Sequence, residues 1–168
     1  MNGSQIYGGY MQKDSYEFNH FESLRRITSE LRRVSSPVIY VSGDIHASEL
    51  MRIESEQLGY ETFEITSSGI HSFINPFDAS YVNPRRLAAK MDFNFTVIEA
   101  AAVGPDRVDL GITAYGRNRK VFYTHTASVA RGWYVSKLSN QYNRSRFIDS
   151  IHVGFYFLAI AALAEQRV

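Results

Sequence analysis

The feature that most constrains the fold is an amphipathic helix pattern followed at once by a short apolar strand pattern. Between residues 17 and 34 the apolar side chains recur every three or four positions, which places them on one helix face: Phe18, Phe21, Leu24, Ile27, Leu31 and Val34. The run at 35–37 (Ser-Ser-Pro) ends this pattern, and 37–41 is a continuous apolar run typical of a strand buried on both faces. A helix followed by a buried strand predicts an α/β layer.

Beyond this strand the sequence becomes rich in β patterns. We expect a brief helix within 47–54, a strand at 60–66 and a loop-like region at 72–92. Three further strand patterns follow at 94–101, 107–115 and 120–124. The turn at 116–119 (Gly-Arg-Asn-Arg) joins the last two as a hairpin. The predicted fold class is α/β (α+β), with flanking helices and a β-rich, antiparallel latter half.

Composition limits the classes of protein to which the chain can belong. With 168 residues and 45% hydrophobic content it can bury a real core, so intrinsic disorder is not expected. The formal net charge of +1 gives no global field, so no nucleic-acid partner is predicted. The local arginine pairs are interpreted as solvated surface: 25–26, 32–33 and 85–86. The absence of cysteine excludes disulfides and thiolate metal sites and leaves localisation undetermined.

An apolar segment lies near the C-terminus, at 151–164. A membrane-spanning helix needs about 20 mostly apolar residues, and this run is shorter and is interrupted by His152. We therefore expect a C-terminal apolar helix buried against the rest of the chain or a partner chain, and no membrane contact. The predicted domain organisation is a main domain at 1–126 and a C-terminal extension at 127–168.

The residues with the clearest chemical potential follow the first strand. Gly43 permits a sharp turn, and Asp44 and His46, two apart in extended geometry, can point the same way. A carboxylate and an imidazole so placed can bind a divalent or ferric ion. A polar turn at 66–71, which contains Ser68 and His71, follows the next strand, so polar groups gather at two strand ends. The alternative is a Gly-Asp turn with a histidine packed beside it.

Four segments together resemble the alkaline phosphatase D type (PhoD-like) metallophosphatases, relatives of the calcineurin-like phosphoesterases. They occur in the family's order and lie at 14–16 (Asp-Ser-Tyr), 41–49 (Val-Ser-Gly-Asp-Ile-His-Ala-Ser-Glu), 64–72 (Glu-Ile-Thr-Ser-Ser-Gly-Ile-His-Ser) and 94–99. The resemblance implies a partial metallophosphoesterase-like β-sandwich that hydrolyses phosphomonoesters or phosphodiesters with a metal-activated hydroxide. It implies a binuclear site of Ca, Mn, Fe or Zn. It also implies that Asp44 and His46 are metal ligands, and that Asp14, Ser68 and His71 contact the substrate or orient the metal ligands.

The chain departs from the family in one respect. The family takes most metal ligands from elements such as an Asp motif, Gly-Asp and Gly-Asn-His, and none of these occurs before Asp14. We therefore expect the C-terminal part of a phosphoesterase that is inactive as an isolated chain. Two alternatives stay open: a subunit completed by a partner chain that supplies the missing half, and a non-catalytic binding or interaction module.

Overall fold

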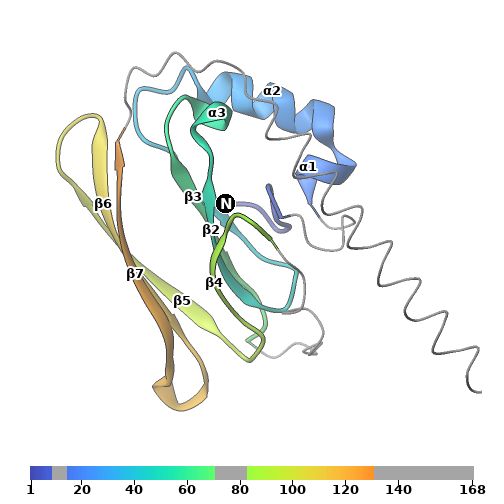
Figure 1. The fold of residues 1–168 in the computed structure, drawn as a ribbon, viewed down its shortest axis with the longest axis vertical. Coiled ribbons are helices and arrows are strands. Elements are labelled where there is room, and N and C mark those ends of the chain that lie inside the picture. Colours follow the sequence, from blue (N-terminus) through green and yellow to red (C-terminus); the bar gives the residue numbers. More distant parts are fainter. Residues whose placement is uncertain (9–14, 71–82, 131–168) are drawn as a thin grey trace, which may run out of the picture.

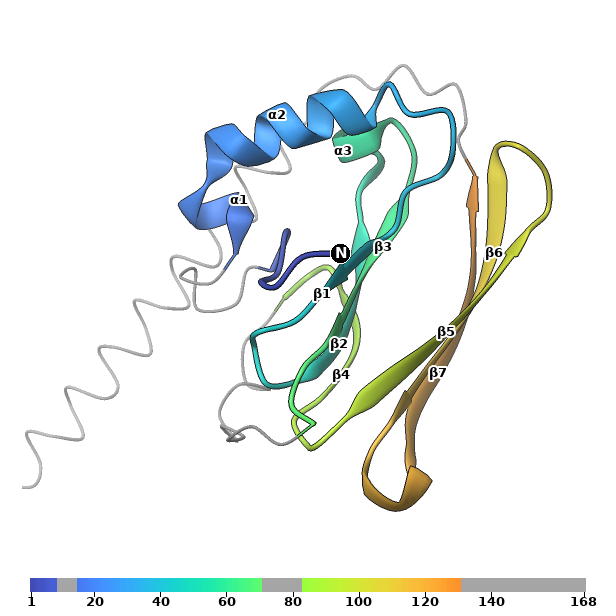
Figure 2. The same cartoon turned by 180° about the vertical axis from the view of Figure 1, so that it is seen from behind.

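Two β-sheets lie against each other, and the helices cover the outer face of one of them (Figures 1 and 2). The computed structural model describes residues 1–8, 15–70 and 83–130. Within these ranges the chain forms two helices, then two strands, then a third helix and then five strands. The predicted α/β class with a β-rich latter half is confirmed.

The first sheet is mixed and has the strand order β1-β3-β2-β4. Its strands are β1 (Tyr40–Ser42), β2 (Ser48–Ile53), β3 (Thr62–Ser67) and β4 (Arg86–Lys90). β1 runs parallel to β3, whereas β2 is antiparallel to both β3 and β4. Two strands with parallel direction end at the same edge of the sheet, and this fixes where the loops after them meet.

The second sheet is an antiparallel meander of β5 (Phe95–Ala102), β6 (Arg107–Tyr115) and β7 (Val121–Ala130). A short 3-10 turn at Arg117–Arg119 joins the last two strands, so the predicted hairpin is confirmed. β7 spans the domain boundary predicted between residues 126 and 127.

The helices are α1 (Tyr16–Asn19), α2 (Phe21–Leu31) and α3 (Ser55–Leu58). The single predicted helix at 17–34 is therefore two helices, with His20 at the break between them. Leu24 and Thr28 are the buried positions of α2, while Phe21 and Ile27 flank them and are about two-fifths exposed, 42% and 40%. Of the predicted apolar face, Leu24 is therefore buried and Leu31 partly buried, whereas Phe18, Phe21, Ile27 and Val34 are exposed; the predicted face is confirmed only at its centre.

The core lies on both faces of the first sheet: Leu24 of α2 and Tyr7 of the N-terminal segment belong to it, and so do residues between the two sheets. Alternate residues of β2 and β3 face the second sheet, among them Leu50, Phe63 and Ile65, and they meet Ile112 and Val129 in one buried cluster. Ser48 and Tyr123 also join the sheets through a 2.6 Å hydrogen bond between their hydroxyls.

Two predicted elements are wrong. The brief helix expected within 47–54 is strand β2, because its residues bury side chains on both sheet faces and only Arg52 is exposed. Tertiary pairing on both sides overrides the good helix propensity of Glu, Leu and Met. The region expected to be loop at 72–92 contains β4, which pairs with β2 at a register shift after Leu50.

The arginine pair at 85–86 was also misread as solvated surface. Arg85 is 9% exposed and binds Glu17 at 2.7 Å and Glu54 at 2.5 Å. Burial alone would lower the pKa of Arg85, but the carboxylates of Glu17 and Glu54 raise it above its usual value. Arg86 lies 2.5 Å from the buried carboxylate of Glu49. Both arginines therefore neutralise buried acids.

In the part of the chain that the structure describes, no helix is long and apolar enough to cross a membrane. The C-terminal apolar helix predicted at 151–164 lies outside the described residues.

Replacing Arg85 with Met should lower the free energy of unfolding by roughly 3–5 kcal/mol, because it removes the cation from between two largely buried carboxylates. The matched control is Arg52→Met, whose ion pair with Glu61 is exposed, at 59% and 53%. That change should cost about 1 kcal/mol or less. Urea denaturation measures both, and equal losses would contradict the role given to Arg85.

Candidate functional site

The candidate site lies where the parallel strands β1 and β3 end side by side. Ser42 pairs with Thr66 at the last step of their register, so the loop after β1 and the turn after β3 leave the sheet together. This edge brings together the predicted site residues Asp44, His46 and Ser68. The other two, Asp14 and His71, lie outside the described residues.

Hydrogen bonds join the loop to the turn. The backbone N–H of His46 donates to the Ser68 hydroxyl at 3.3 Å, and the N–H of Ser68 donates to the carbonyl of Ala47 at 3.0 Å. The amide of Asn94 donates to the Ser68 carbonyl at 2.7 Å, while its oxygen accepts from the Ser67 hydroxyl at 3.2 Å. Asn94 therefore connects the start of the second sheet to the turn, a role that its sequence context did not indicate.

The loop backbone is unusual at both candidate ligands. Asp44 has φ +77° and His46 has φ +53°, so both lie in the left-handed region that favours glycine. The prediction that they continue in extended geometry is therefore wrong. Non-glycine residues adopt this conformation rarely, and such strain gathers at functional sites.

Asp44 is exposed and meets the N-terminal segment. The Ser4 hydroxyl donates to its carboxylate at 3.2 Å, and the N–H of Asn2 donates to the Val41 carbonyl at 2.9 Å. Residues 2–4 therefore run beside the outer edge of β1, next to the candidate ligand.

The side chains at the candidate site are of the type that binds metal ions, but they are too few for a complete metal site. A carboxylate at Asp44 and an imidazole at His46 suit the predicted ions. Within residues 1–8, 15–70 and 83–130, however, no three His, Cys, Asp or Glu side chains lie close enough together to hold a metal ion. The described residues alone therefore do not fit a binuclear centre.

Sequence reasoning missed a buried polar chain beneath this edge. Gln5 donates through its amide to Glu49 at 2.7 Å and to Thr66 at 2.9 Å, and Thr66 hydrogen bonds with Ser42 at 2.9 Å. Arg86 completes the chain from β4 by donating to Glu49 at 2.5 Å. This series of hydrogen bonds crosses all four strands of the first sheet and ends at Ser42, two residues before Asp44. Its sequence signal is the acidic Glu49 directly before the apolar residues Leu50 and Met51.

Glu64 ties the N-terminal segment to the sheet. Its two carboxylate oxygens accept the backbone N–H groups of Ile6 and Tyr7, each at 2.7 Å, and it is fully buried. Burial raises the pKa of Glu64 to about 7, although these two donors and the Ser42 hydroxyl act in the opposite direction; the nearby Glu49 raises the pKa further.

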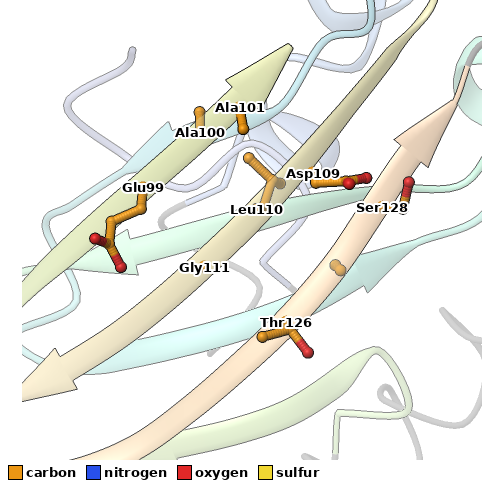
Figure 3. A pocket seen from close by; sticks show the side chains of 9 residues that line it. Glu99, Ala100, Ala101, Asp109, Leu110, Gly111, Thr126 and Ser128 are labelled. Carbon is orange, nitrogen blue, oxygen red and sulfur yellow. The ribbon is translucent and has the colours of Figure 1, made fainter. Parts of the chain in front are cut away.

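A hollow elsewhere is unrelated to the candidate residues. It has a volume of about 610 Å³ and lies on the second sheet, over Gly111 (Figure 3). A Cβ atom added at Gly111 would lie 3.4 Å from a carboxylate oxygen of Glu99. Asp109, Thr126 and Ser128 line the same hollow, and none of the predicted site residues does.

Comparison of the chain with family models, with curated proteins and with solved structures finds no match. The resemblance to PhoD-like metallophosphatases therefore stays a prediction drawn from residues and motifs.

The Glu64 carboxyl should make stability depend on pH. Its pKa is about 7 in the folded chain against an ordinary 4.5, so the folded state retains a proton that the unfolded state has lost between these values. The free energy of unfolding should therefore fall as pH rises from 4.5 to 7, by up to roughly 3 kcal/mol in total.

Urea denaturation at pH 5 and pH 8 tests this in the wild type, in Glu64→Gln and in the control Glu61→Gln, whose side chain is 53% exposed. The wild type and the control should show the same loss of stability between the two pH values, and Glu64→Gln a clearly smaller one. An unchanged loss in Glu64→Gln would show that another group carries the dependence.

Proposed function

We propose that this chain contributes the Asp44 and His46 element of a metal-dependent phosphoesterase site, which hydrolyses phosphomonoesters or phosphodiesters. The observation that carries the proposal is the joined end of the two parallel strands, where both candidate ligands have left-handed backbones. Ligand-binding residues of sheets with parallel strands lie beyond their carboxyl ends. Strained backbone at the same residues supports a role in binding.

The side chains at this edge have two proposed roles, metal binding and positioning. His46 offers an imidazole nitrogen and Asp44 a carboxylate, a combination that suits Mn, Fe, Zn or Ca. Ser68 fixes the backbone of His46, and Asn94 fixes Ser68, so these two act as positioning residues. Bound metal ions would supply an activated water and neutralise the phosphate charge.

The remaining ligands must come from outside the described ranges or from a second polypeptide. Asp14 and His71 belong to the first group. The finer fold assignment, a partial metallophosphoesterase-like β-sandwich, belongs to this proposal, and the two stacked sheets with helices on one face support it. Since two donors bind metal weakly, we expect the chain alone to hydrolyse phosphate esters slowly or not at all.

One observation favours the alternative of a non-catalytic interaction module. The Asp44 carboxylate accepts the Ser4 hydroxyl, as a turn residue with a purely structural role would do. In that case the chain would fold well and bind neither metal nor phosphate.

Titration of the whole chain with Mn²⁺, followed by paramagnetic broadening of histidine resonances in NMR spectra, separates these functions. His46 should broaden first, and His46→Ala should weaken Mn²⁺ binding roughly tenfold or more. The control is His20→Ala, because His20 is exposed and lies at the break between α1 and α2. Equal Mn²⁺ binding in the wild type and both variants would eliminate the proposed site.

Any hydrolysis of a nitrophenyl phosphate monoester or diester should also disappear in His46→Ala and persist in His20→Ala. Activity that survives the loss of His46 would place the reaction elsewhere in the chain.

A further inference from the structure

Four cations gather near the candidate loop and form what we name the cationic hairpin cluster. They are Lys90, the last residue of β4, and Arg117, Arg119 and Lys120, which lie in the turn between β6 and β7. All four are exposed, and none forms an ion pair with another residue in the described ranges. Their charge is therefore available to a ligand.

Two of these cations, Arg117 and Lys90, lie over aromatic rings. The Arg117 guanidinium lies 3.7 Å from the centre of the Phe93 ring, and the Lys90 ammonium lies 5.9 Å from that of Phe122. Gly116 makes room for the second ring, because a Cβ atom there would lie 2.1 Å from Phe122. The cluster is thus partly preorganised, although its members are at the surface.

The hairpin turn has an arginine, Arg119, at a position where such turns usually have glycine. Asn118 and Arg119 have φ +57° and +59°, a pair of left-handed residues of the kind that tight hairpin turns use. Asparagine tolerates this conformation, but the second position strongly favours glycine. An arginine that breaks this local rule without an evident structural gain points to a role for its charge.

The cluster and the candidate loop share one end of the molecule. Phe93, beneath Arg117, is followed by Asn94, which donates to the carbonyl of Ser68 at 2.7 Å. Lys90 pairs in register with Ser48, two residues after His46. In both views the hairpin between β6 and β7 lies at the lower end, far from α2 (Figures 1 and 2).

We propose that the cationic hairpin cluster binds a phosphate group of the substrate and so favours phosphate esters that carry more than one phosphate. This inference rests on the proposed function and names its substrate class. Arginine guanidinium groups bind phosphate oxygens in pairs, and Lys90 and Lys120 add point charges. Asp92, two residues after Lys90, accepts the N–H of Phe93 at 2.8 Å through its carboxylate and forms no ion pair with the four cations in the described ranges.

The aromatic rings favour a simple phosphate compound over a single-stranded nucleic acid. Nucleic-acid sites of this kind need open ring faces on which bases stack. Here Arg117 covers a face of Phe93, and Phe122 packs against Gly116 on one side and faces Lys90. Each ring thus has a cation over one face, which leaves less ring surface for a base to stack on.

Calorimetric titration of the whole chain with inorganic pyrophosphate, in the presence of a chelator and about 0.1 M salt, tests the site. The triple variant R117Q/R119Q/K120Q should bind pyrophosphate roughly tenfold more weakly than the wild type. The matched control R25Q/R26Q/R33Q removes the same charge from exposed positions on and just beyond α2. The control should change affinity less than about twofold, because α2 lies at the opposite end of the molecule from the hairpin (Figures 1 and 2) and salt at this concentration screens charges beyond a Debye length of about 10 Å.

A second variant separates charge from turn structure. Arg119→Gly should keep or raise the thermal stability of the chain, because glycine suits the left-handed position, and should still weaken pyrophosphate binding. Equal affinity in the wild type and R117Q/R119Q/K120Q would overturn the proposal. So would equal weakening by both triple variants, or tighter binding of a single-stranded oligonucleotide that shifts the ring resonances of Phe93 and Phe122.

His46→Ala distinguishes this inference from the proposed function. Pyrophosphate binding should persist in that variant, and Mn²⁺ binding should persist in R117Q/R119Q/K120Q. If His46→Ala leaves Mn²⁺ binding unchanged while R117Q/R119Q/K120Q weakens pyrophosphate binding, the phosphoesterase proposal is overturned and the anion site stands. The opposite result would overturn the anion site alone.

Discussion

Two buried carboxylates on one face of the first sheet determine how the rest of this chain is arranged. Glu49 and Glu64 are fully buried, and buried acids are tolerated only when other groups satisfy them. Gln5 and Arg86 bind the first, and the backbone N–H groups of the N-terminal segment bind the second. The N-terminal segment must therefore lie across the sheet. Once it does so, Asn2 and Ser4 reach the edge of β1 and the Asp44 carboxylate.

The same polar layer supports the candidate loop from below. The hydrogen-bond chain from Arg86 to Ser42 crosses the first sheet and ends where the loop begins. Above it, the backbone of His46 is held by Ser68, and Ser68 by Asn94. A loop supported on both sides can maintain left-handed residues that would otherwise relax. The position of Asp44 and His46 is thus a property of the whole sheet and its N-terminal cover.

The contacts of Asn94 and Phe93 extend this arrangement to the second sheet. Asn94 reaches back to the turn after β3, and Phe93 lies beneath Arg117 of the hairpin. The first sheet therefore contributes oxygen and nitrogen donors and Lys90 to one end of the molecule, and the hairpin of the second sheet contributes three further positive charges. The proposed binding of a phosphate ester rests on this combination.

The sequence by itself determined the helix face centred on Leu24, the strands β3, β5 and β6, the hairpin after Tyr115, and the gathering of polar residues at two strand ends. These follow from local periodicity and turn chemistry, which depend on near neighbours in the chain. Only the tertiary structure decided that 48–53 is a strand, that Arg85 and Arg86 are buried, and that Asp44 and His46 turn away from extended geometry. Each of these depends on partners remote in sequence: β3 and β4 for the strand, Glu17 and Glu49 for the arginines, and Ser68 for the loop. Pairing energies between distant segments leave no local pattern from which they could be read.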